Sequence, residues 1–453
     1  MSPLDPARLS AARLVAYSAP SLVTSVAALP MALFVPAFYS DDLGVPLAAV
    51  GGAIAASRLL DVVTDPLIGT LSDRLRLPLG RRKPWMLVGL PIFLVSLWNI
   101  FVPSGEVSAT SLLGWSAALY LGFTMLDLPH KAWGAELSTD YDERSRIASW
   151  REALSTFGQV LLLAALVLLA QQGVEDAALQ LRSIALVVVV ALPVLLLACL
   201  AFVEEREPEV VHRQERSLLA GLAIVARNPA FKRMVGCVLF FVSGVAIQGT
   251  LHRLVLADVM LDEGRFPVMI LCENLATLAA VPIWLRVSVR FGKPQALLGA
   301  ALWIALWSVP LAFLREGDTS MLVALVVLRG SSFASILFLA NSIAADVVDV
   351  DTLESGEQRS GLFFAVWGMM IKLSLALGVV LGTALPAAAG YDPSVDVVAG
   401  EIQTRLMAIY GGVPALLMAV GALCLRGFPI TRERHAEVRA RIEAGAADGT
   451  SGS

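Results

Sequence analysis

The stretch from Arg58 to Pro66 (Arg-Leu-Leu-Asp-Val-Val-Thr-Asp-Pro) contains three charged residues. It lies inside a segment that is otherwise hydrophobic enough to cross a bilayer. A charged residue at the centre of a membrane helix costs roughly 2.5–3.5 kcal/mol, so such groups persist mainly where they face a bundle interior or a polar cavity. Asp61 and Asp65 share one helical face, where two carboxylates repel each other unless a cation, a proton or a basic side chain lies between them. The pattern predicts a cation-coupling site.

The alternative is a structural network in which Arg58 and Lys372 neutralise both carboxylates and nothing is transported through the site. A purely structural network gains little from a second carboxylate one turn away, so the cation site is favoured. Lys372 lies in the middle of another apolar segment, too deep for its side chain to reach either interface. We therefore expect it to pair with a carboxylate.

The composition is typical of a polytopic membrane protein and excludes a soluble enzyme. Of the 453 residues, 57% are hydrophobic and 16% are charged, and the mean hydropathy is +0.74. The net charge of -4 is too small and too dispersed to indicate a nucleic acid or an acidic partner. All four cysteines fall in apolar segments without metal-ligand spacing, so neither disulfides nor a zinc site is predicted, and no cofactor is expected.

An intramembrane enzyme is the weakest interpretation, because no His-rich metal cluster, Ser-His pair or Cys-His pair is predicted at membrane depth. Of the four histidines, only His130 is placed well inside a helix. His252, Arg253 and Asp258 cluster near the expected outer end of a helix and are predicted to be rim charges.

Twelve segments are long enough to span, given that about 20 apolar residues cross the hydrocarbon core. They are 14–38, 47–71, 85–104, 110–136, 147–170, 182–203, 232–256, 266–287, 295–314, 320–345, 360–388 and 403–425. Lys and Arg gather in the loops after the second, sixth and eighth segments, which places both termini and the middle loop in the cytoplasm by the positive-inside rule. The first segment is too long for a signal-peptide core and is predicted to be a membrane helix.

The chain is expected to form two halves of six helices. The predicted halves are residues 1–203 and 232–426, joined by a cytoplasmic middle loop, 204–231, and followed by a partly disordered cytoplasmic tail, 427–453. Gly80-Arg81-Arg82-Lys83-Pro84 recurs as Gly292-Lys293-Pro294, and Ala135-Glu136 recurs as Ala345-Asp346. An all-α membrane protein with such a parallel repeat has the major facilitator architecture, with its substrate site between the halves near the bilayer midplane.

These residues resemble one particular branch of transporters. Arg58-x-x-Asp61-x-x-Thr64-Asp65-Pro66 resembles the signature of the glycoside-pentoside-hexuronide:cation symporters, a family that includes the bacterial melibiose carrier. The resemblance covers most of the chain and continues through Gly69, Ser72-Asp73-Arg74, Thr124-x-x-Asp127-x-Pro129, Asp142-Glu143-Arg144 with Arg151, and Gly361 to Lys372. It implies symport of a glycoside or a similar small solute, driven by sodium, lithium or protons.

The resemblance also implies a set of cation-binding residues. They are Asp61, Thr64, Asp65 and Thr124, with Lys372 as a nearby charge partner. Asp61 and Asp65 would hold Na⁺ or Li⁺ if the coupling ion is not a proton. The melibiose carrier has an asparagine in place of Thr64, so the preferred cation stays open.

For the solute, the resemblance implies Asp127 and Arg151, which can accept from and donate to vicinal hydroxyls. Ser25 stands where the melibiose carrier has a carboxylate, and Lys131 stands where it has a stacking tryptophan, with Trp133 two residues further on. These departures lead us to expect a solute other than a galactoside.

Three candidate ligands have other interpretations. Asp127 could be a helix-packing contact, and Arg151, about one turn into its helix, could extend to the cytoplasmic interface. Glu273 matches nothing in the family pattern. It is interpreted as a protonated core carboxylate, a second proton site or a substrate ligand, and these alternatives stay open.

The loop after the second segment predicts a conformational gate. Gly69-x-x-x-Asp73-Arg74 with Gly80-Arg81-Arg82 resembles the general major facilitator loop that latches the two halves in the outward-facing state. Positive-inside anchoring would account for the basic residues but not for Gly69, Gly80 and Asp73.

Two other functions remain open beside glycoside symport. One is cation-coupled symport of a lysolipid-like amphiphile, because the mammalian sodium-dependent lysolipid symporters resemble the same branch. The other is a non-coupled membrane sensor, which the short tail after Thr431 does not favour. The expected partners are a small solute, a cation and the lipid bilayer, with the protein a monomer in a bacterial inner membrane.

Overall fold

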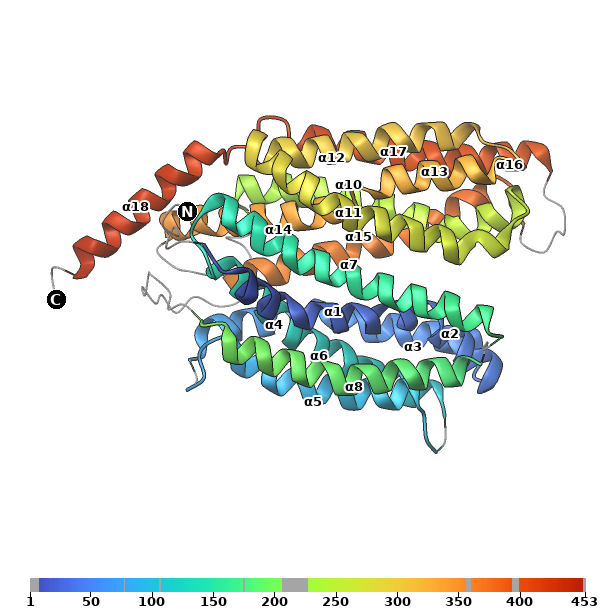
Figure 1. Ribbon diagram of the computed structural model, residues 1–453, viewed down its shortest axis with the longest axis horizontal. Helices are drawn as coiled ribbons and strands as arrows, with labels where there is room; N and C mark the ends of the chain where they lie inside the picture. The colour runs from blue at the N-terminus through green and yellow to red at the C-terminus, as the bar shows by residue number, and fades with distance from the viewer. Residues whose placement is uncertain are drawn as a thin grey trace. The chain divides into compact units, whose positions relative to one another are not determined.

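The computed structural model describes residues 8–76, 78–105, 107–173, 176–205, 227–355, 360–392 and 399–450, and these fold almost entirely into helices (Figure 1). Most of the predicted middle loop lies outside the described residues.

The helices before the middle loop follow the predicted segments closely. They are α1 (Ala11–Leu33), α2 (Val35–Ala37), the π-helical η1 (Phe38–Asp42), α3 (Leu47–Leu59), α4 (Asp61–Arg74), α5 (Lys83–Phe101), α6 (Ala109–Glu136), α7 (Tyr141–Gln171) and α8 (Ala177–Phe202).

The helices after the middle loop are interrupted more often by short 3₁₀ or π turns. They are α10 (Pro229–Leu254), η2 (Val255–Val259), η3 (Glu263–Arg265), α11 (Phe266–Phe291), α12 (Lys293–Ser308), η4 (Val309–Phe313), α13 (Thr319–Gly330), α14 (Phe333–Ser355), α15 (Ser360–Ala388), α16 (Gly400–Met407), η5 (Ala408–Gly412), α17 (Val413–Cys424) and α18 (Arg432–Thr450).

Within the described part of the chain, 11 helical stretches are long and apolar enough to cross a membrane. The remaining predicted segment, 47–71, is present as α3 and α4, which are 13 and 14 residues long and separate at Leu60. The break falls between Arg58 and Asp61, the same polar residues that lower the hydropathy of this segment.

Single residues explain where α7 begins and where α11 ends. The Asp140 carboxylate accepts a hydrogen bond from the backbone N–H of Glu143 at 2.7 Å and so caps α7. This helix therefore begins at Tyr141, six residues before the predicted start at 147, and Arg151 lies nearly three turns into it. Gly292 has a φ of 92° and ends α11, a backbone conformation that side chains other than glycine rarely adopt.

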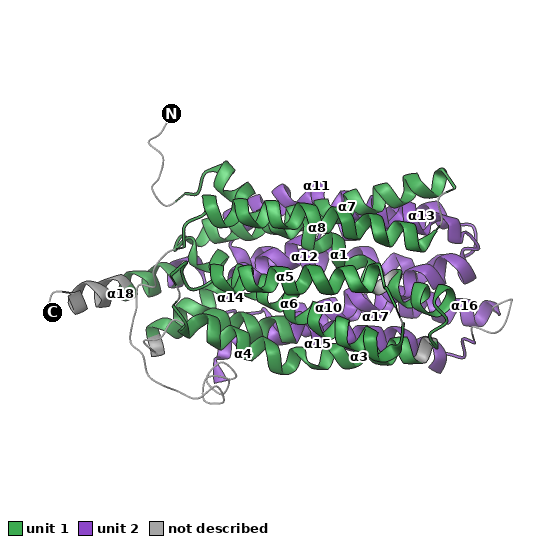
Figure 2. Cartoon of the chain, turned by 90° about the horizontal axis from the view of Figure 1, so that it is seen from below, with its two compact units in different colours: residues 1–225, 345–369, 435–453 green, residues 226–344, 370–434 purple. Residues whose placement is uncertain are grey.

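The chain forms two compact units (Figure 2). Unit 1 comprises residues 1–225, 345–369 and 435–453, and unit 2 comprises residues 226–344 and 370–434. In unit 1, α6 packs against α3, α4 and α5, while α1 packs against α7 and α8. In unit 2, α10 packs against α17, and α11 and α12 both pack against α13.

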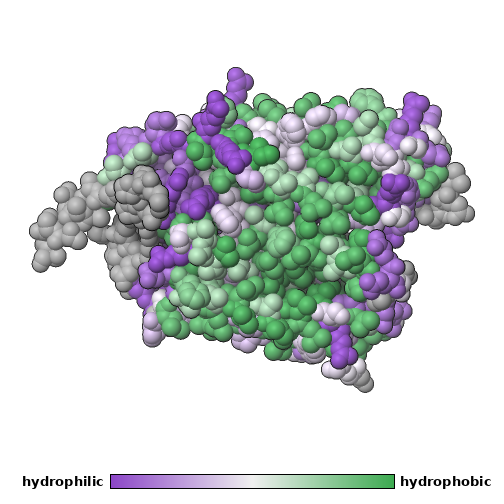
Figure 3. Space-filling view, viewed as in Figure 1, coloured by the Kyte–Doolittle hydropathy of each residue, from purple (hydrophilic) through white to green (hydrophobic). Residues whose placement is uncertain are grey.

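The surface over α5 and α8 of unit 1 is largely apolar, and hydrophilic side chains gather toward the ends of these helices (Figure 3). Val88 and Val95 on α5 are 54% and 52% exposed, and Val190 on α8 is 66% exposed. Large apolar side chains exposed at this density are typical of a surface that contacts lipid.

Candidate functional site

The break between α3 and α4 places two acidic side chains inside unit 1. Asp61 is the first residue of α4, where the partial positive charge of a helix N-terminus favours a carboxylate. Asp65 follows one turn later, and each residue is only 2% exposed. The Thr64 hydroxyl donates to the Leu60 carbonyl at 3.1 Å, beside the helix break.

Helix α6 supplies a hydroxyl group that contacts one of these carboxylates. The Thr124 hydroxyl, on a residue that is 3% exposed, donates to Asp65 Oδ1 at 2.7 Å. Two buried carboxylates beside a hydroxyl form an all-oxygen donor set, which fits a hard cation such as Na⁺ or Li⁺. The described residues contain no group of three or more His, Cys, Asp or Glu side chains placed to hold a metal ion.

The two basic residues predicted near the carboxylates have different surroundings. The Arg58 guanidinium lies 3.9 Å above the ring of Tyr120 on α6, a cation–π contact. Lys372 belongs to the part of α15 that lies in unit 2, and its pairing with Asp61 or Asp65 stays a prediction.

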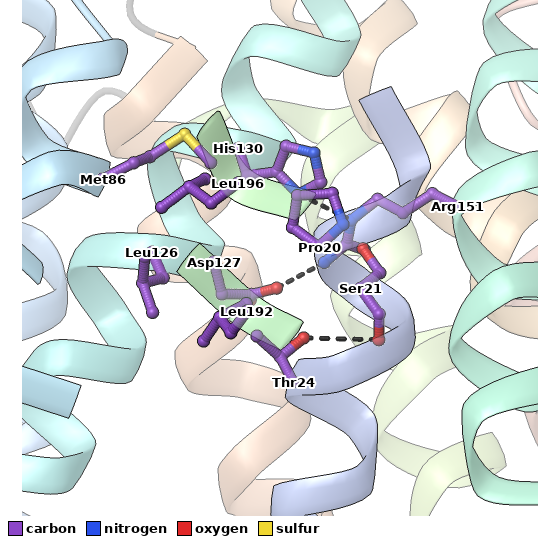
Figure 4. Close-up of a pocket in the computed structure, with 10 residues that line it drawn as sticks. All are labelled: Pro20, Ser21, Thr24, Met86, Leu126, Asp127, His130, Arg151, Leu192 and Leu196. Atoms are coloured by element: carbon purple, nitrogen blue, oxygen red, sulfur yellow. Dashed lines mark hydrogen bonds and ion pairs between the residues drawn. The ribbon is translucent and has the colours of Figure 1, made fainter. Parts of the chain in front are cut away.

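A small pocket lies one turn along α6 from Thr124 (Figure 4). Its polar lining comes from α1, α6 and α7, and its apolar lining comes mostly from α5, α6 and α8. The lining residues are Pro20, Ser21, Thr24, Met86, Leu126, Asp127, His130, Arg151, Leu192 and Leu196. The Ser21 hydroxyl is buried and makes no hydrogen bond to any described residue, so it is available to a ligand.

Asp127 joins two bases in this pocket. Arg151 donates to one of its carboxylate oxygens, and Lys131 Nζ lies 2.7 Å from the other. The Arg151 side chain is only 13% exposed, so extension toward an interface is the wrong interpretation of this residue.

His130 fixes the relative position of α1 and α6 beside the pocket. Its Nε2 lies 2.8 Å from the Tyr17 carbonyl, and the Tyr17 hydroxyl donates to the His130 carbonyl at 2.9 Å. Because a carbonyl only accepts, His130 carries a proton on Nε2, which leaves Nδ1 to face Arg151 Nε at 3.5 Å.

Four of the predicted solute ligands do not line the pocket: Ser25, Lys131, Trp133 and Glu273. Ser25 donates to the Ser155 carbonyl at 2.7 Å and so contributes to the packing of α1 on α7. Trp133 is fully buried, lies edge-on to Tyr17 with ring centroids 6.1 Å apart, and donates to the Glu204 carbonyl at 3.4 Å. Ser25 and Trp133 lie on the helices predicted for them, but the geometry gives each a packing role.

Three of the predicted gate residues belong to an ionic cluster, here called the latch, which comprises Asp73, Arg81, Arg82, Glu136 and Glu205. Arg82 Nη2 lies 2.7 Å from Asp73 and 2.6 Å from Glu136, and Arg81 Nη2 lies 2.6 Å from Glu136. Glu205 accepts the backbone N–H groups of Arg81 and Arg82 at 2.7 and 2.8 Å. The sequence predicts the two arginines and Asp73, but not Glu136 and Glu205 as their partners.

Burial lowers the pKa of Arg82, but the charges and hydrogen bonds of Glu136 and Asp73 outweigh burial and raise the pKa above its ordinary value. The arginine thus stays charged at any accessible pH. Arg82 thus has specific acidic partners in the latch, which positive-inside anchoring alone would not require.

Asp73 also caps the start of α15. Its two carboxylate oxygens accept the backbone N–H groups of Gly361 and Leu362 at 2.8 and 2.9 Å. A carboxylate at this position satisfies two of the N–H groups that every helix N-terminus leaves unpaired.

Gly69 permits the close approach of α4 and α15 that the cap requires. A Cβ on Gly69 would lie 2.6 Å from the Gly361 carbonyl oxygen and 2.8 Å from Ala365 Cβ, so Gly69→Ala must push the two backbones apart. We expect a loss of about 1–3 kcal/mol in the free energy of unfolding, measured by denaturation in detergent.

Gly51→Ala is the matched control, because Gly51 lies on α3 with no atom within 4 Å of its would-be Cβ. This variant should be neutral or stabilising by about 0.5–1 kcal/mol, as expected for replacing glycine by alanine within a helix. Equal effects at Gly51 and Gly69 would show that the close approach contributes nothing.

A second ionic cluster in unit 1 was not predicted as part of the site. Arg144 makes a bidentate contact with Asp349, at 2.6 and 3.1 Å, and lies 3.2 Å from Asp346. His435 at the start of the tail helix lies 3.0 Å from Asp349. The repeat of Ala135-Glu136 as Ala345-Asp346 is the sequence signal that marks this region.

Glu273 belongs to unit 2, whereas the residues that line the pocket all belong to unit 1. It pairs with Arg329 at 2.7 Å, and His252 lies 3.8 Å from the same carboxylate. The prediction that His252 is a rim charge is wrong, because its side chain is turned into the helix bundle and is only 3% exposed.

Known proteins resemble this chain over nearly its whole length. A family model described as MFS/sugar transport protein matches residues 16–432. The putative glycoside/cation symporter YagG of Escherichia coli is 27% identical, with 88% of this chain and 87% of that protein covered. Sodium-dependent lysophosphatidylcholine symporter 1 of Xenopus tropicalis is 23% identical, with 94% and 88% covered.

The crystal structure of the E. coli fucose:proton symporter FucP resembles this chain with a TM-score of 0.64 at 16% identity, and the match covers 93% of this chain and 98% of that one. A likeness at this level of identity shows the fold.

Proposed function

Because this chain belongs to the MFS/sugar transport protein family and has the major facilitator fold, we propose that it couples Na⁺, Li⁺ or H⁺ to the symport of a glycoside or a related small solute. As a member of that family it is an integral membrane transporter and not an enzyme.

The observation that carries this proposal is the position of Thr124 and Asp127 on one helix. Thr124 donates to Asp65 at 2.7 Å, and Asp127, one turn away on α6, lines the pocket with Arg151. A change in the charge of the carboxylate pair therefore acts on the same helix that presents the solute ligand. Cation and solute sites joined in this way can bind interdependently.

The proposed mechanism is alternating access driven by charge compensation. A cation between Asp61 and Asp65 removes their mutual repulsion and holds α4 against α6, which completes the solute site at Asp127. A charge buried without a partner costs several kcal/mol, so the transporter changes conformation readily when it is either fully loaded or empty. A half-loaded transporter is held back.

The pocket chemistry supports a solute that carries both donors and acceptors. Asp127 accepts, Arg151 and Lys131 donate, and the Ser21 hydroxyl can do either. Vicinal hydroxyls of a sugar ring match this mixture.

A lysolipid-like amphiphile is the second candidate solute, and the apolar wall of the pocket supports it. Met86, Leu126, Leu192 and Leu196 contribute apolar side chains to the lining, which also contains Asp127 and Arg151. A solute with a polar head and an apolar tail would find partners of both kinds there. The lysophosphatidylcholine symporter among the relatives carries such a molecule according to its name.

A ligand screen with purified protein in detergent tests the solute class. Glycosides and lysophosphatidylcholine are added separately with sodium, and thermal unfolding is recorded for wild type, Asp127→Asn and Ser25→Ala. We expect a glycoside to raise the melting temperature of wild type and Ser25→Ala, but not of Asp127→Asn. The reason is that Asp127 lines the pocket and Ser25 does not.

Stabilisation by lysophosphatidylcholine and by no glycoside would identify an amphiphile as the transported solute. If no solute and no cation changes the stability of wild type, coupled transport is rejected and a membrane sensor without transport becomes the better interpretation.

We also propose that the protein works as a monomer in a bacterial inner membrane with both termini in the cytoplasm. The supporting observations are the basic loops after the second, sixth and eighth predicted segments and the E. coli relative.

A further inference from the structure

Unit 2 contains a buried cluster of titratable side chains that the proposed transport site does not use. Its members are Glu273 on α11, Arg329 on α13, His252 on α10 and Tyr410 in η5, and they are 5%, 0%, 3% and 0% exposed. Arg329 Nη2 donates to Glu273 Oε1 at 2.7 Å and lies 3.2 Å from His252 Nε2. His252 Nδ1 lies 2.6 Å from the Tyr410 hydroxyl.

The internal repeat makes Glu273 the counterpart of Asp61. Glu273 follows Asp61 by the same number of residues that separate Gly80 from Gly292, and Thr277 follows Asp65 by that number too. Unit 2 therefore has one carboxylate where unit 1 has two.

In unit 2, a threonine hydroxyl stands in place of the second carboxylate, and an arginine side chain supplies a permanent positive charge. The Thr277 hydroxyl donates to the Gly330 carbonyl at 2.7 Å, and the Arg329 guanidinium occupies the place beside Glu273. Because arginine is always protonated in proteins, Glu273 already has a permanent counter-charge and needs no metal cation. The one exchangeable positive species left to this cluster is a proton.

Hydrogen-bond polarity determines the tautomer of His252. The guanidinium of Arg329 can only donate, so Nε2 of His252 must accept and carries no proton. A neutral imidazole has one N–H group, which then lies on Nδ1 and donates to the Tyr410 hydroxyl. His252 is thus a neutral base with its lone pair inside the cluster.

An added proton has an acceptor already in place. Glu273 Oε2 lies 3.8 Å from His252 Nε2. Protonation at Nε2 breaks the hydrogen bond from Arg329 and allows the new N–H to donate to Glu273. No other bond changes, and the proton comes from water.

We propose that this cluster is a second coupling site, specific for protons, in which His252 and Glu273 share an incoming proton beside Arg329. The inference rests on the proposed function only in calling the site a coupling site; the proton binding itself is independent of which ion occupies the carboxylate pair of unit 1.

Protonation adds one positive charge to a dry cluster, which favours a conformation that admits water. Two donors of Arg329, Nε and Nη1, are buried and make no hydrogen bond to any described residue, so water has a place to bind. The buried arrangement is therefore the unprotonated one. Proton binding would favour opening of unit 2 around the cluster.

The other charged groups of the elements around the cluster face elsewhere. Arg253 on α10 pairs with Glu263 of η3 at 2.6 Å, where both side chains are at least half exposed. Asp258 of η2 accepts from Tyr391 at 2.5 Å. Gln248, an uncharged polar neighbour, donates to the Tyr410 carbonyl at 3.0 Å.

Nitrogen NMR of histidine-labelled, full-length protein in detergent tests the proposal, because the chain has only 4 histidines. His252→Gln identifies the signal of His252. We expect this residue to be an Nδ1–H tautomer at high pH, while His130 serves as an internal reference with its proton on Nε2. On acidification His252 should become doubly protonated.

Glu273→Gln removes the proposed acceptor of the shared proton. In this variant, the pH at which His252 becomes protonated should fall by at least about one unit, which is a tenfold higher proton concentration. Glu263→Gln is the matched control, since it removes an exposed carboxylate, and it should leave the titration unchanged. Asp65→Asn should also leave it unchanged, which separates this proposal from the cation site of unit 1.

An Nε2–H tautomer at His252, a titration that Glu273→Gln does not move, or no protonation between about pH 5 and pH 9 would each overturn the proposal. If Glu273→Gln does not fold, Tyr410→Phe replaces it in the test. Because Arg329 still donates to Nε2, His252 should then remain an Nδ1–H tautomer with a shifted Nδ1 signal, and an Nε2–H tautomer or an unchanged spectrum would count against the site.

Discussion

Replacing Arg82 with glutamine is expected to lower the free energy of unfolding by about 3–5 kcal/mol, the cost of removing one partner from a buried ion pair. The fully buried guanidinium lies 2.7 Å from Asp73 and 2.6 Å from Glu136. Without it, Asp73 loses its guanidinium partner in the latch and Glu136 keeps only Arg81. Asp73 would also be drawn from its position as the cap of α15.

Chemical or thermal unfolding in detergent measures this loss. Arg265→Gln is the control, because Arg265 is 57% exposed and its contact with Asp262 is worth at most about 1 kcal/mol. Adding Glu136→Gln to Arg82→Gln should recover part of the loss, since one of the two carboxylates that lost Arg82 is removed. Equal stability of Arg82→Gln and Arg265→Gln would mean that the latch does not stabilise unit 1.

Asp65→Asn is expected to abolish uphill accumulation of the solute while leaving downhill exchange measurable. The amide removes one of the two carboxylates and with it the repulsion that a bound cation relieves, so cation binding would no longer draw α4 against α6. Uptake into membrane vesicles is measured with the solute that the ligand screen identifies, under a sodium gradient and then under a proton gradient.

Asp262→Asn is the matched control in that experiment, because Asp262 is an exposed partner of Arg265 outside both sites. It should accumulate solute as wild type does. Full accumulation by Asp65→Asn would remove the carboxylate pair from the coupling mechanism.

The sequence predicts the helices well, because about 20 apolar residues in a row can only be satisfied in lipid as a helix. It also predicts that Asp61, Asp65 and Thr124 belong together, and the structure places Thr124 against Asp65. The break at Leu60 was not predicted, since tertiary contacts of α3 and α4 determine where a helix separates.

Side-chain partners far apart in the chain are harder to predict. Ser25 and Trp133 were assigned by position in a related pattern. Yet Ser21, one helical turn before Ser25, and Thr24, its neighbour in the chain, both line the pocket, while Ser25 packs against α7. A hydrophobic pattern shows that such a residue is buried. It does not show which neighbour its polar atoms meet.

The same limit applies to Glu273. Its burial could be predicted, but its pairing with Arg329 and His252 depends on the packing of α10, α11 and α13 in unit 2. The 3.6-residue period of a helix identifies one face, and it leaves open which of several neighbouring helices that face meets.

The thermal stability of purified protein in sodium, lithium and potassium, at several pH values and beside Asp65→Asn, tests cation binding at the carboxylate pair most directly. A ligand that binds only the folded protein adds about 2.7 kcal/mol at a hundredfold excess over its Kd. We predict that sodium or lithium stabilises wild type relative to potassium and has no such effect on Asp65→Asn. Equal stability of both proteins in all three cations and at every pH would contradict a coupling site at Asp61 and Asp65.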